Sequence, residues 1–242
     1  MAVEVWQVPV AQCRAIAERS LSRLDEAERG RASRFRRPED RARYLVSRVS
    51  LRSLLGARLS VDPWALEFGQ GPHGKPQLVD PFGGLWFNSS HSGQYVVHAF
   101  STDGPVGVDV EAVPAVLPRP DELHAALAPE EVESLLAIRS DCRAFAFALA
   151  WARKEAYVKA IGEGLNRDPS RICILDGRAR GPTLRYDLNA PCMTQDWMLS
   201  DLVFDRQHAG CVASSGREGP IVRRLIPDVF EKSGWIELAA RV

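Results

Sequence analysis

The strongest constraint on the fold is a helix that has to be buried although it contains charged side chains. The segment from Ser140 or Asp141 to Ile161 has a helical pattern, and the glycines that follow it are expected to end the helix. Its small and aromatic residues indicate that most of its surface is covered; they are Phe145, Ala148, Leu149, Trp151, Ala152, Ala156 and Tyr157. Glu155 and Lys159 are four residues apart and therefore share one face. Isolated charges are costly in such surroundings, so we expect partners from outside the helix; a simple surface ion pair is the alternative.

A second segment places two acids on one face of a predicted strand. In Gly107-Val108-Asp109-Val110-Glu111 the side chains alternate, so Asp109 and Glu111 point the same way while the valines enter the core. Two carboxylates ~4 Å apart near a protein surface repel each other by up to about 4 kcal/mol, and a bound cation removes that cost. The alternative is an exposed strand on which both acids are solvated.

The remaining pattern predicts an α+β fold. A basic helical segment covers residues 31–55, with a start at Pro38 and an end at Gly56, and another helix opens at Pro129. Strands are expected at residues 85–87, 95–100, 105–111, 172–175, 183–188, 197–204 and 210–213. The proline-rich stretch 112–120 is a natural linker, so we expect an N-terminal subdomain, residues 1–112, and a C-terminal subdomain, residues 113–242.

A polar segment follows the first of these strands. We expect Asn88 to Gly93 to form a loop at one end of the sheet, with Ser90 and His91 in it. Hydroxyls, an imidazole and backbone N–H groups all donate hydrogen bonds, which suits contact with a phosphate. The alternatives are a generic polar turn and a serine–histidine pair, but the latter lacks a visible aspartate partner.

Positive charge is supplied almost entirely by arginine. Of the 31 basic residues only four are lysines: Lys75, Lys154, Lys159 and Lys232. A cluster of arginines precedes and enters the first long helix: Arg31, Arg34, Arg36, Arg37, Arg41 and Arg43. Guanidinium groups bind phosphate in a bidentate manner, although a solvated helix face explains part of such a cluster equally well.

Charge and composition exclude several classes of protein. The 31 basic residues balance 31 acidic ones, which argues against a general binder of nucleic acid or other polyanions. The longest apolar run, residues 144–152, is too short to span a membrane, and the N-terminus shows no secretory signal. Five cysteines without a C-x-x-C pair indicate free thiols, so we expect a cytoplasmic protein.

Together these motifs resemble one enzyme family, the 4′-phosphopantetheinyl transferases of the larger, monomeric type. The resemblance lies in their order and spacing: Arg34-Phe35 with Glu39-Asp40 and Arg43, Gly74-Lys75-Pro76, Phe87-Asn88 with Ser90-His91-Ser92, Gly107 to Glu111, and Trp151 to Leu165. The last two motifs are highly specific. Ala152 stands where a hydroxyl residue is usual, and Ser89 where an aliphatic residue is common.

The resemblance implies two similar α/β subdomains packed with pseudo-twofold symmetry, and a magnesium-dependent transfer from coenzyme A to a serine of an acyl or peptidyl carrier protein. It implies Asp109, Glu111 and Glu155 as Mg²⁺ ligands, with Asp109, Glu155 and Lys159 as the catalytic residues. Glu155 would accept the serine proton. The residues implied for coenzyme A are Arg31, Arg34, Arg43, Gly74, Lys75, Pro76, Ser90, His91, Asp109 and Lys159.

Two other classes of function are compatible with the same residues. One is a non-enzymatic adaptor whose arginine-rich helix binds an acidic partner, with strong salt sensitivity and no need for magnesium. The other is a different magnesium-dependent nucleotide transferase, which ATP or GTP would protect better than coenzyme A does.

Overall fold

The computed structural model describes residues 3–71, 74–79, 84–162, 167–177, 181–190, 197–215 and 220–224. The helices are α1 (Val10–Arg19), α2 (Glu26–Arg34), α3 (Pro38–Leu59), α4 (Pro120–Ala126), α5 (Pro129–Ala137) and α6 (Arg143–Ile161), with short 3-10 turns at Leu21–Arg23, Ser140–Cys142 and Pro169–Arg171. The strands are β1 (Glu4–Pro9), β2 (Phe68–Gln70), β3 (Pro76–Leu78), β4 (Trp86–Ser92), β5 (Tyr95–Ser101), β6 (Val106–Ala112), β7 (Ile172–Gly177), β8 (Gly181–Asp187), β9 (Met198–Leu202), β10 (His208–Ser214) and β11 (Ile221–Arg224). The α+β prediction is confirmed.

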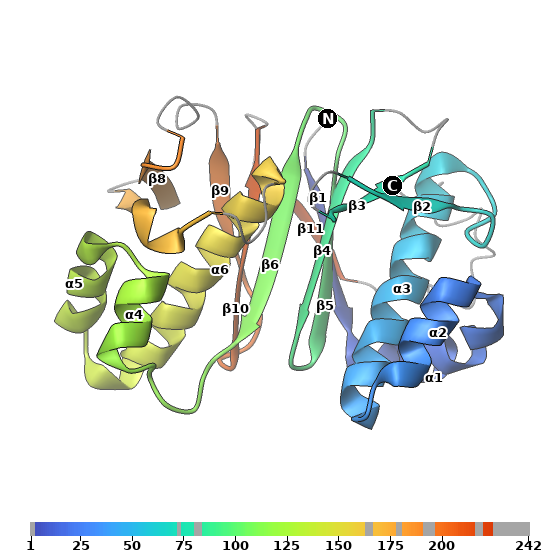
Figure 1. Cartoon of the computed structure of the whole chain (residues 1–242), viewed down its shortest axis with the longest axis horizontal. Helices are drawn as coiled ribbons and strands as arrows, with labels where there is room; N and C mark the ends of the chain where they lie inside the picture. The colour runs from blue at the N-terminus through green and yellow to red at the C-terminus, as the bar shows by residue number, and fades with distance from the viewer. Residues whose placement is uncertain are drawn as a thin grey trace.

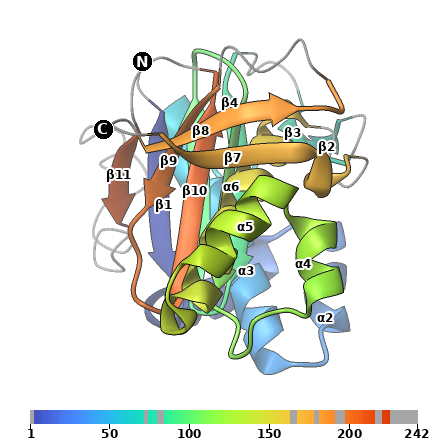
Figure 2. The same cartoon turned by 90° about the vertical axis from the view of Figure 1, so that its left-hand side faces the viewer.

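Two sheets lie side by side in the middle of the molecule, and each is covered by one long helix (Figure 1). One sheet has the order β11-β1-β5-β4 and packs against α3, and the other has the order β6-β10-β9 and packs against α6. The hairpins β2–β3 and β7–β8 form separate two-stranded sheets. Figure 2 shows α4 and α5 beside α6, below the β7–β8 hairpin.

The sheets do not follow the expected division of the chain at residue 112. β6 lies before the linker, yet it pairs antiparallel with β10, with Asp109 opposite Cys211. β11 lies near the end of the chain and pairs parallel with β1 of the other sheet. Each sheet therefore contains strands from both sides of the linker, and the strand that contains Asp109 belongs structurally with α6.

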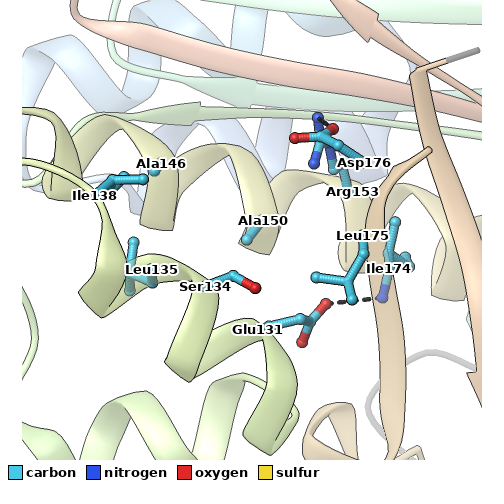
Figure 3. A pocket seen from close by; sticks show the side chains of 10 residues that line it. All are labelled: Glu131, Ser134, Leu135, Ile138, Ala146, Ala150, Arg153, Ile174, Leu175 and Asp176. Carbon is cyan, nitrogen blue, oxygen red and sulfur yellow. Dashed lines mark hydrogen bonds and ion pairs between the residues drawn. The ribbon is translucent and has the colours of Figure 1, made fainter. Parts of the chain in front are cut away.

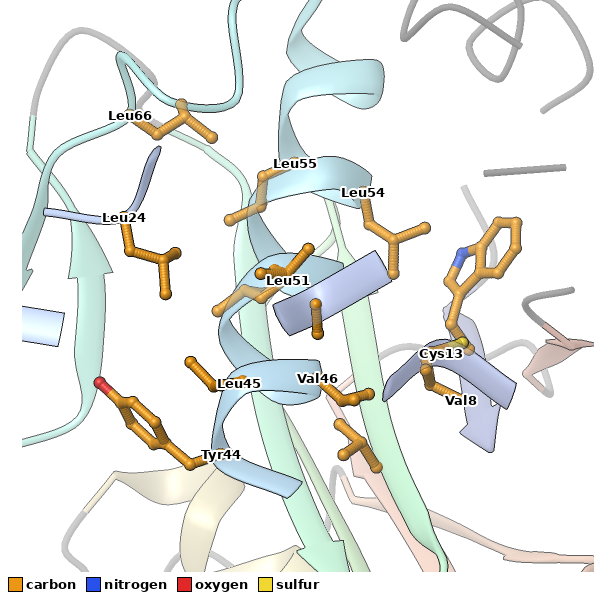
Figure 4. Close-up of a cluster of buried hydrophobic side chains, with 14 of the residues drawn as sticks. Val8, Cys13, Leu24, Tyr44, Leu45, Val46, Leu51, Leu54, Leu55 and Leu66 are labelled. Atoms are coloured by element: carbon orange, nitrogen blue, oxygen red, sulfur yellow. The ribbon is translucent and has the colours of Figure 1, made fainter. Parts of the chain in front are cut away.

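Large side chains separate α3 from its sheet. Pro38 opens the helix and Glu39 and Asp40 occupy its first turn, as the sequence predicts. Leu45, Leu51 and Leu55 lie in one buried cluster that includes residues of β1 and α1 (Figure 4).

The predicted end of this helix at Gly56 is wrong. The helix continues to Leu59 and ends at Ser60, which has a left-handed backbone with φ 56°. A Cβ atom at Gly56 would approach the ring of Pro63 to 2.9 Å. Gly56 is therefore required for close packing within the helix and not for its termination.

The prediction of a loop at residues 88–93 is also wrong, because β4 continues through Ser92 and pairs with β5 along its whole length. Its polar residues are satisfied on both faces. On one face the Ser89 hydroxyl is 2.7 Å from Nδ1 of His98, whose Nε2 is 2.8 Å from the Ser50 hydroxyl of α3. Complete burial lowers the pKa of His98 to about 3, so this imidazole is neutral and links the sheet to the helix. Ser89 therefore replaces an apolar residue without leaving a polar atom unpaired.

Small residues bring α6 much closer to its sheet. Ala148, Ala152, Ala156 and Ala160 are all buried and recur every four residues, which forms a flat stripe. The stripe meets β6 at Gly107, where a Cβ atom would collide with the backbone of Ala156 and Ala160. Ala152, which stands where a hydroxyl residue is usual, is fully buried in this stripe.

Candidate active site

Asp109 lies at the centre of the site, on β6 beneath α6. Its side chain is almost completely buried. Oδ1 accepts hydrogen bonds from Nζ of Lys159 at 2.5 Å and from the Ser90 hydroxyl at 2.6 Å, and these two donors are themselves 3.2 Å apart. Burial raises the pKa of Asp109, and the Lys159 ammonium opposes that shift. The structure thus brings together residues from β4, β6 and α6, including the partner that the buried helix was expected to need.

Two further carboxylates surround this ion pair. Burial, followed by the negative charges of Asp109 and Glu155, raises the pKa of Glu111 to about 7, while the Lys159 ammonium opposes this shift. Burial also raises the pKa of Glu155, with Lys159 acting against this shift and Asp109 adding to it. Three acids therefore share the charge of one ammonium group, so the site attracts an additional cation.

Side chains of β4 hold the edge of β6, where the two sheets meet without backbone pairing. Asn88 Oδ1 accepts a hydrogen bond from the Val108 N–H at 2.9 Å, and the Ser92 hydroxyl accepts one from the Ala112 N–H at 2.9 Å. Ser90 lies between them and binds Asp109. Asn88 and Ser92 were not among the predicted site residues. Their spacing of two residues from Ser90 could have indicated them, because alternate residues of a strand share one face.

Arginines of α2 and α3 influence the histidine next to Ser90. Burial lowers the pKa of His91, and the positive charges of Arg43, Lys159 and Arg31 add to this shift. Arg43 also forms an ion pair with Asp40 at 2.6 Å. The Arg31 guanidinium lies over the ring of Tyr44, 5.4 Å from its centroid.

Arg34 and Arg41, from the same cluster, are not among the largest influences on the pKa of His91. Arg34 is exposed at the end of α2. Arg41 pairs with Glu18 of α1 at 2.6 Å and serves the packing of helices. Arg41 therefore has a structural role, whereas the phosphate contacts expected of Arg31, Arg34 and Arg43 stay predictions.

The Gly74-Lys75-Pro76 segment forms part of the β2–β3 hairpin. Gly74 is exposed with φ 78°, and Pro76 opens β3. The Lys75 ammonium donates hydrogen bonds to the carbonyl oxygens of Lys159, at 2.7 Å, and Val106, at 3.1 Å. The hairpin therefore contacts the same helix end and strand start that carry the ion pair. Residues 163–165, the last of the α6 motif, lie outside the described residues.

Lys154 lies in the same motif but points away from the site. It forms a buried ion pair with Glu131 of α5 at 2.6 Å and donates to the carbonyl oxygens of Pro169 and Ile172. Glu131 in turn accepts from the N–H groups of Ala128 and Ile174. This lysine therefore joins α5, α6 and β7, and its role is structural.

A cavity of about 210 Å³ lies on that side of α6, between α5 and β7 (Figure 3). Ala146, Ala150 and Arg153 of α6 line it, and their spacing places them on the opposite face of the helix from Glu155 and Lys159. Arg153 is held by Asp176 and Asp201 at 2.6–2.8 Å. The cavity is thus separated from the Asp109 site by the helix.

The donor set fits a hard divalent cation. Carboxylate oxygens are the ligands that Mg²⁺ prefers, and Oδ2 of Asp109 is buried and has no hydrogen-bond partner among the described residues. No group of three acidic, histidine or cysteine side chains already arranged to hold a metal ion is found in the described parts of the chain. In this structure the positive charge beside Asp109 is the Lys159 ammonium. An acidic centre flanked by arginine and histidine can bind a phosphorylated ligand together with a cation.

Two family models cover most of the chain. Residues 10–103 match the model for 4′-phosphopantetheinyl transferase, N-terminal, and residues 105–213 match the model for the 4′-phosphopantetheinyl transferase superfamily. The 4′-phosphopantetheinyl transferase HetI of Nostoc sp. is 33% identical over 223 residues, which is 88% of each chain. The chain belongs to the 4′-phosphopantetheinyl transferase superfamily. The family and the transferase class predicted from the motifs are therefore confirmed.

Other relatives in this superfamily align over shorter regions. A Synechocystis sp. protein named for the same activity, slr0495, is 40% identical over 147 residues, 59% of this chain and 58% of that protein. The 4′-phosphopantetheinyl transferase Sfp of Bacillus subtilis is 32% identical over 152 residues, 62% of this chain and 65% of that protein.

Among the described residues, none of the helices combines the length and the apolar character that crossing a bilayer requires.

Proposed function

We propose that this protein transfers 4′-phosphopantetheine from coenzyme A to a serine of an acyl or peptidyl carrier protein, with Mg²⁺ bound at the Asp109 site. The observation that supports this most directly is the buried Asp109, which has one oxygen paired with Lys159 and Ser90 and the other unpaired. Family membership supports the same reaction class.

Asp109, Glu111 and Glu155 would hold the ion. When bound, Mg²⁺ neutralises charge on the diphosphate of coenzyme A. Burial is the main cause of the raised pKa of Glu111 and of Glu155, and the negative charge of Asp109 adds to it in both cases. A cation bound among the three acids would offset these costs, which supports the assignment.

The chain's own groups orient the two substrates. The Lys159 ammonium, which lies beside Ser90, would contact a phosphate oxygen, and Ser90 and His91 would hold the diphosphate. Arg43 and Arg31, whose charges reach His91, would bind the 3′-phosphate, with Arg34 at the end of α2 as an outer contact. Gly74 to Pro76 would line the adenine pocket.

In the transfer step the serine oxygen forms a bond to the β-phosphorus, and the bond from that phosphorus to adenosine 3′,5′-bisphosphate breaks. The serine proton passes to a carboxylate oxygen of Glu155, directly or through one water molecule. The raised pKa of this group makes it a better proton acceptor than an ordinary exposed glutamate.

The test is incubation of the protein with a panel of apo carrier proteins, coenzyme A and Mg²⁺, followed by mass spectrometry of the carriers. We expect a mass increase equal to one phosphopantetheine group on at least one carrier, lost when EDTA replaces Mg²⁺. No modification across fatty-acid, polyketide and peptide carriers would contradict the proposal. Protection against heat by ATP exceeding that by coenzyme A would favour another nucleotide transferase.

A further inference from the structure

Lys75 connects the two halves of the molecule at the end of α6; the first half is the sheet β11-β1-β5-β4 with α3, and the second is the sheet β6-β10-β9 with α6. It comes from the β2–β3 hairpin, which packs with the first half, and its ammonium donates to two carbonyl oxygens of the second. One belongs to Lys159, in the last turn of α6, and the other to Val106, the first residue of β6. These two backbone positions flank the ion pair between Lys159 and Asp109.

The local physics favours an ammonium at this position. The last carbonyl groups of a helix lack partners within the helix, and the negative end of the helix dipole attracts a cation. Gly162 ends α6 with φ 80°, and the aliphatic stem of Lys75 lies beside it, with Cδ 3.9 Å from where a Cβ of residue 162 would be. Burial lowers the pKa of Lys75 to about 8, because the ammonium group is partly removed from water. The two carbonyl oxygens replace water as its hydrogen-bond partners.

We propose that Lys75 is a positioning residue that holds the C-terminal end of α6 against the start of β6, and thereby sets the placement of Lys159 beside Asp109. One ammonium fixes the backbone of Lys159 itself and the backbone three residues before Asp109. The inference rests on the proposed function, since the consequence for catalysis follows only if Lys159 and Asp109 act in the transfer.

This role belongs to the Lys75 ammonium and is separate from the lining of the adenine pocket proposed for residues 74–76. It differs from a direct contact of the ammonium with coenzyme A. A ligand contact would make the loss of Lys75 resemble the loss of Arg43, with weaker binding of coenzyme A and an unchanged helix. A positioning role predicts a loosened helix end and a slower reaction.

The kinetic experiment compares Lys75→Met, Lys75→Arg and the control Arg43→Ala in the full chain. For Lys75→Met we expect a roughly tenfold lower kcat, with an unchanged ratio between the KM values for coenzyme A and 3′-dephospho-coenzyme A. Lys75→Arg keeps a cationic donor at the helix end and should recover most of kcat. A rise in KM without a fall in kcat, or no recovery with arginine, would overturn the proposal.

The second experiment needs no activity. Amide hydrogen exchange in α6 near residues 158–162 should be roughly tenfold faster in Lys75→Met than in the wild type, and unchanged in Arg43→Ala. Unchanged exchange in Lys75→Met would overturn the positioning role even if transfer is confirmed. Faster exchange in a protein that modifies no carrier would instead support the role of Lys75 in fixing α6 and refute the proposed function.

Discussion

The two long helices, α3 and α6, each cover one face of a sheet, but they do so with different side chains. Leucines such as Leu45 and Leu55 fill the space under α3, whereas alanines every four residues face the sheet under α6. Gly107 removes the last side chain between α6 and β6. The first helix is thus held at a distance by a thick core, and the second lies almost directly on its strand.

This difference accounts for where each half places its charges. The short Asp109 side chain on β6 can pair with Lys159 only because α6 lies so close. Arg31 and Arg43, by contrast, come from α2 and α3 of the other half. The second half supplies the acids and Lys159, and the first half supplies the arginines and the hydroxyl of Ser90. The site therefore depends on the close packing in one half and on the contact between the halves.

The largest expected effect comes from breaking the close approach of α6. Gly107→Ala should destabilise the protein by at least about 3 kcal/mol and abolish transfer, because the new Cβ meets the backbone of Ala156 and Ala160, which cannot move aside as a side chain can. Urea unfolding and a carrier-modification assay measure the two effects.

Gly30→Ala is the matched control. Gly30 lies in α2 with no atom within 4 Å of the added methyl group, so its replacement should be neutral or stabilise by up to about 1 kcal/mol. Similar stability for both variants would show that α6 does not need this close contact.

The second prediction removes one charge from the α6 side of the site. Glu155→Gln should lower the transfer rate by roughly 10²–10⁴-fold while the melting temperature stays near that of the wild type, because the amide neither accepts the serine proton nor adds charge for a cation. Single-turnover rates at saturating Mg²⁺ give the effect. A rate close to that of the wild type would remove Glu155 as both base and metal ligand.

Much of this arrangement could be predicted from the sequence. Glu155, Lys159 and Asp109 were identified because charges in an alanine-rich helix and paired acids on a valine strand both require partners. The reason for Gly107 in the strand motif was not visible, since it depends on the backbone of a helix about fifty residues away.

Other features depend on contacts that a local pattern does not contain. Asn88 to Ser92 has loop composition, but these residues form a strand because β6 and His98 satisfy their side chains. Gly56 resembles a helix end, but it packs against Pro63. Lys154 and Lys159 are equally conspicuous in the motif, and only the three-dimensional packing separates the structural lysine from the one at the site.

The third prediction tests the contribution of the first half. Arg43→Ala should raise the KM for coenzyme A by roughly tenfold and that for 3′-dephospho-coenzyme A much less, because a charge-assisted contact to the 3′-phosphate is lost. Arg41→Ala is the matched control, since Arg41 is paired with Glu18 away from the site. Equal losses with both substrates would exclude Arg43 from the 3′-phosphate site.

The smallest effect should come from Glu111, at the end of β6 nearest the linker. Its pKa in the folded protein, about 7, lies above its ordinary value of 4.5, so between these pH values the folded state binds more protons than the unfolded chain. Stability due to this group is therefore present below about pH 4.5 and falls as the pH rises toward 7. Glu111→Gln removes the ionisation and should raise the melting temperature in EDTA at pH 8 by about 2–4 °C, with a flatter pH dependence.

In EDTA the Glu111→Gln variant should melt above the wild type, and Mg²⁺ should reverse this order of melting temperatures if the acids of β6 and α6 share the ion. The wild type should then gain more from Mg²⁺ than Glu111→Gln does, because the variant has lost one ligand. If Glu111→Gln melts below the wild type in EDTA, the Lys159 ammonium stabilises the ionised form of Glu111 more than burial and Asp109 destabilise it. Lys159 would then be sufficient to offset the negative charge of Asp109, Glu111 and Glu155. The charge of these acids would no longer imply that the site needs an additional cation.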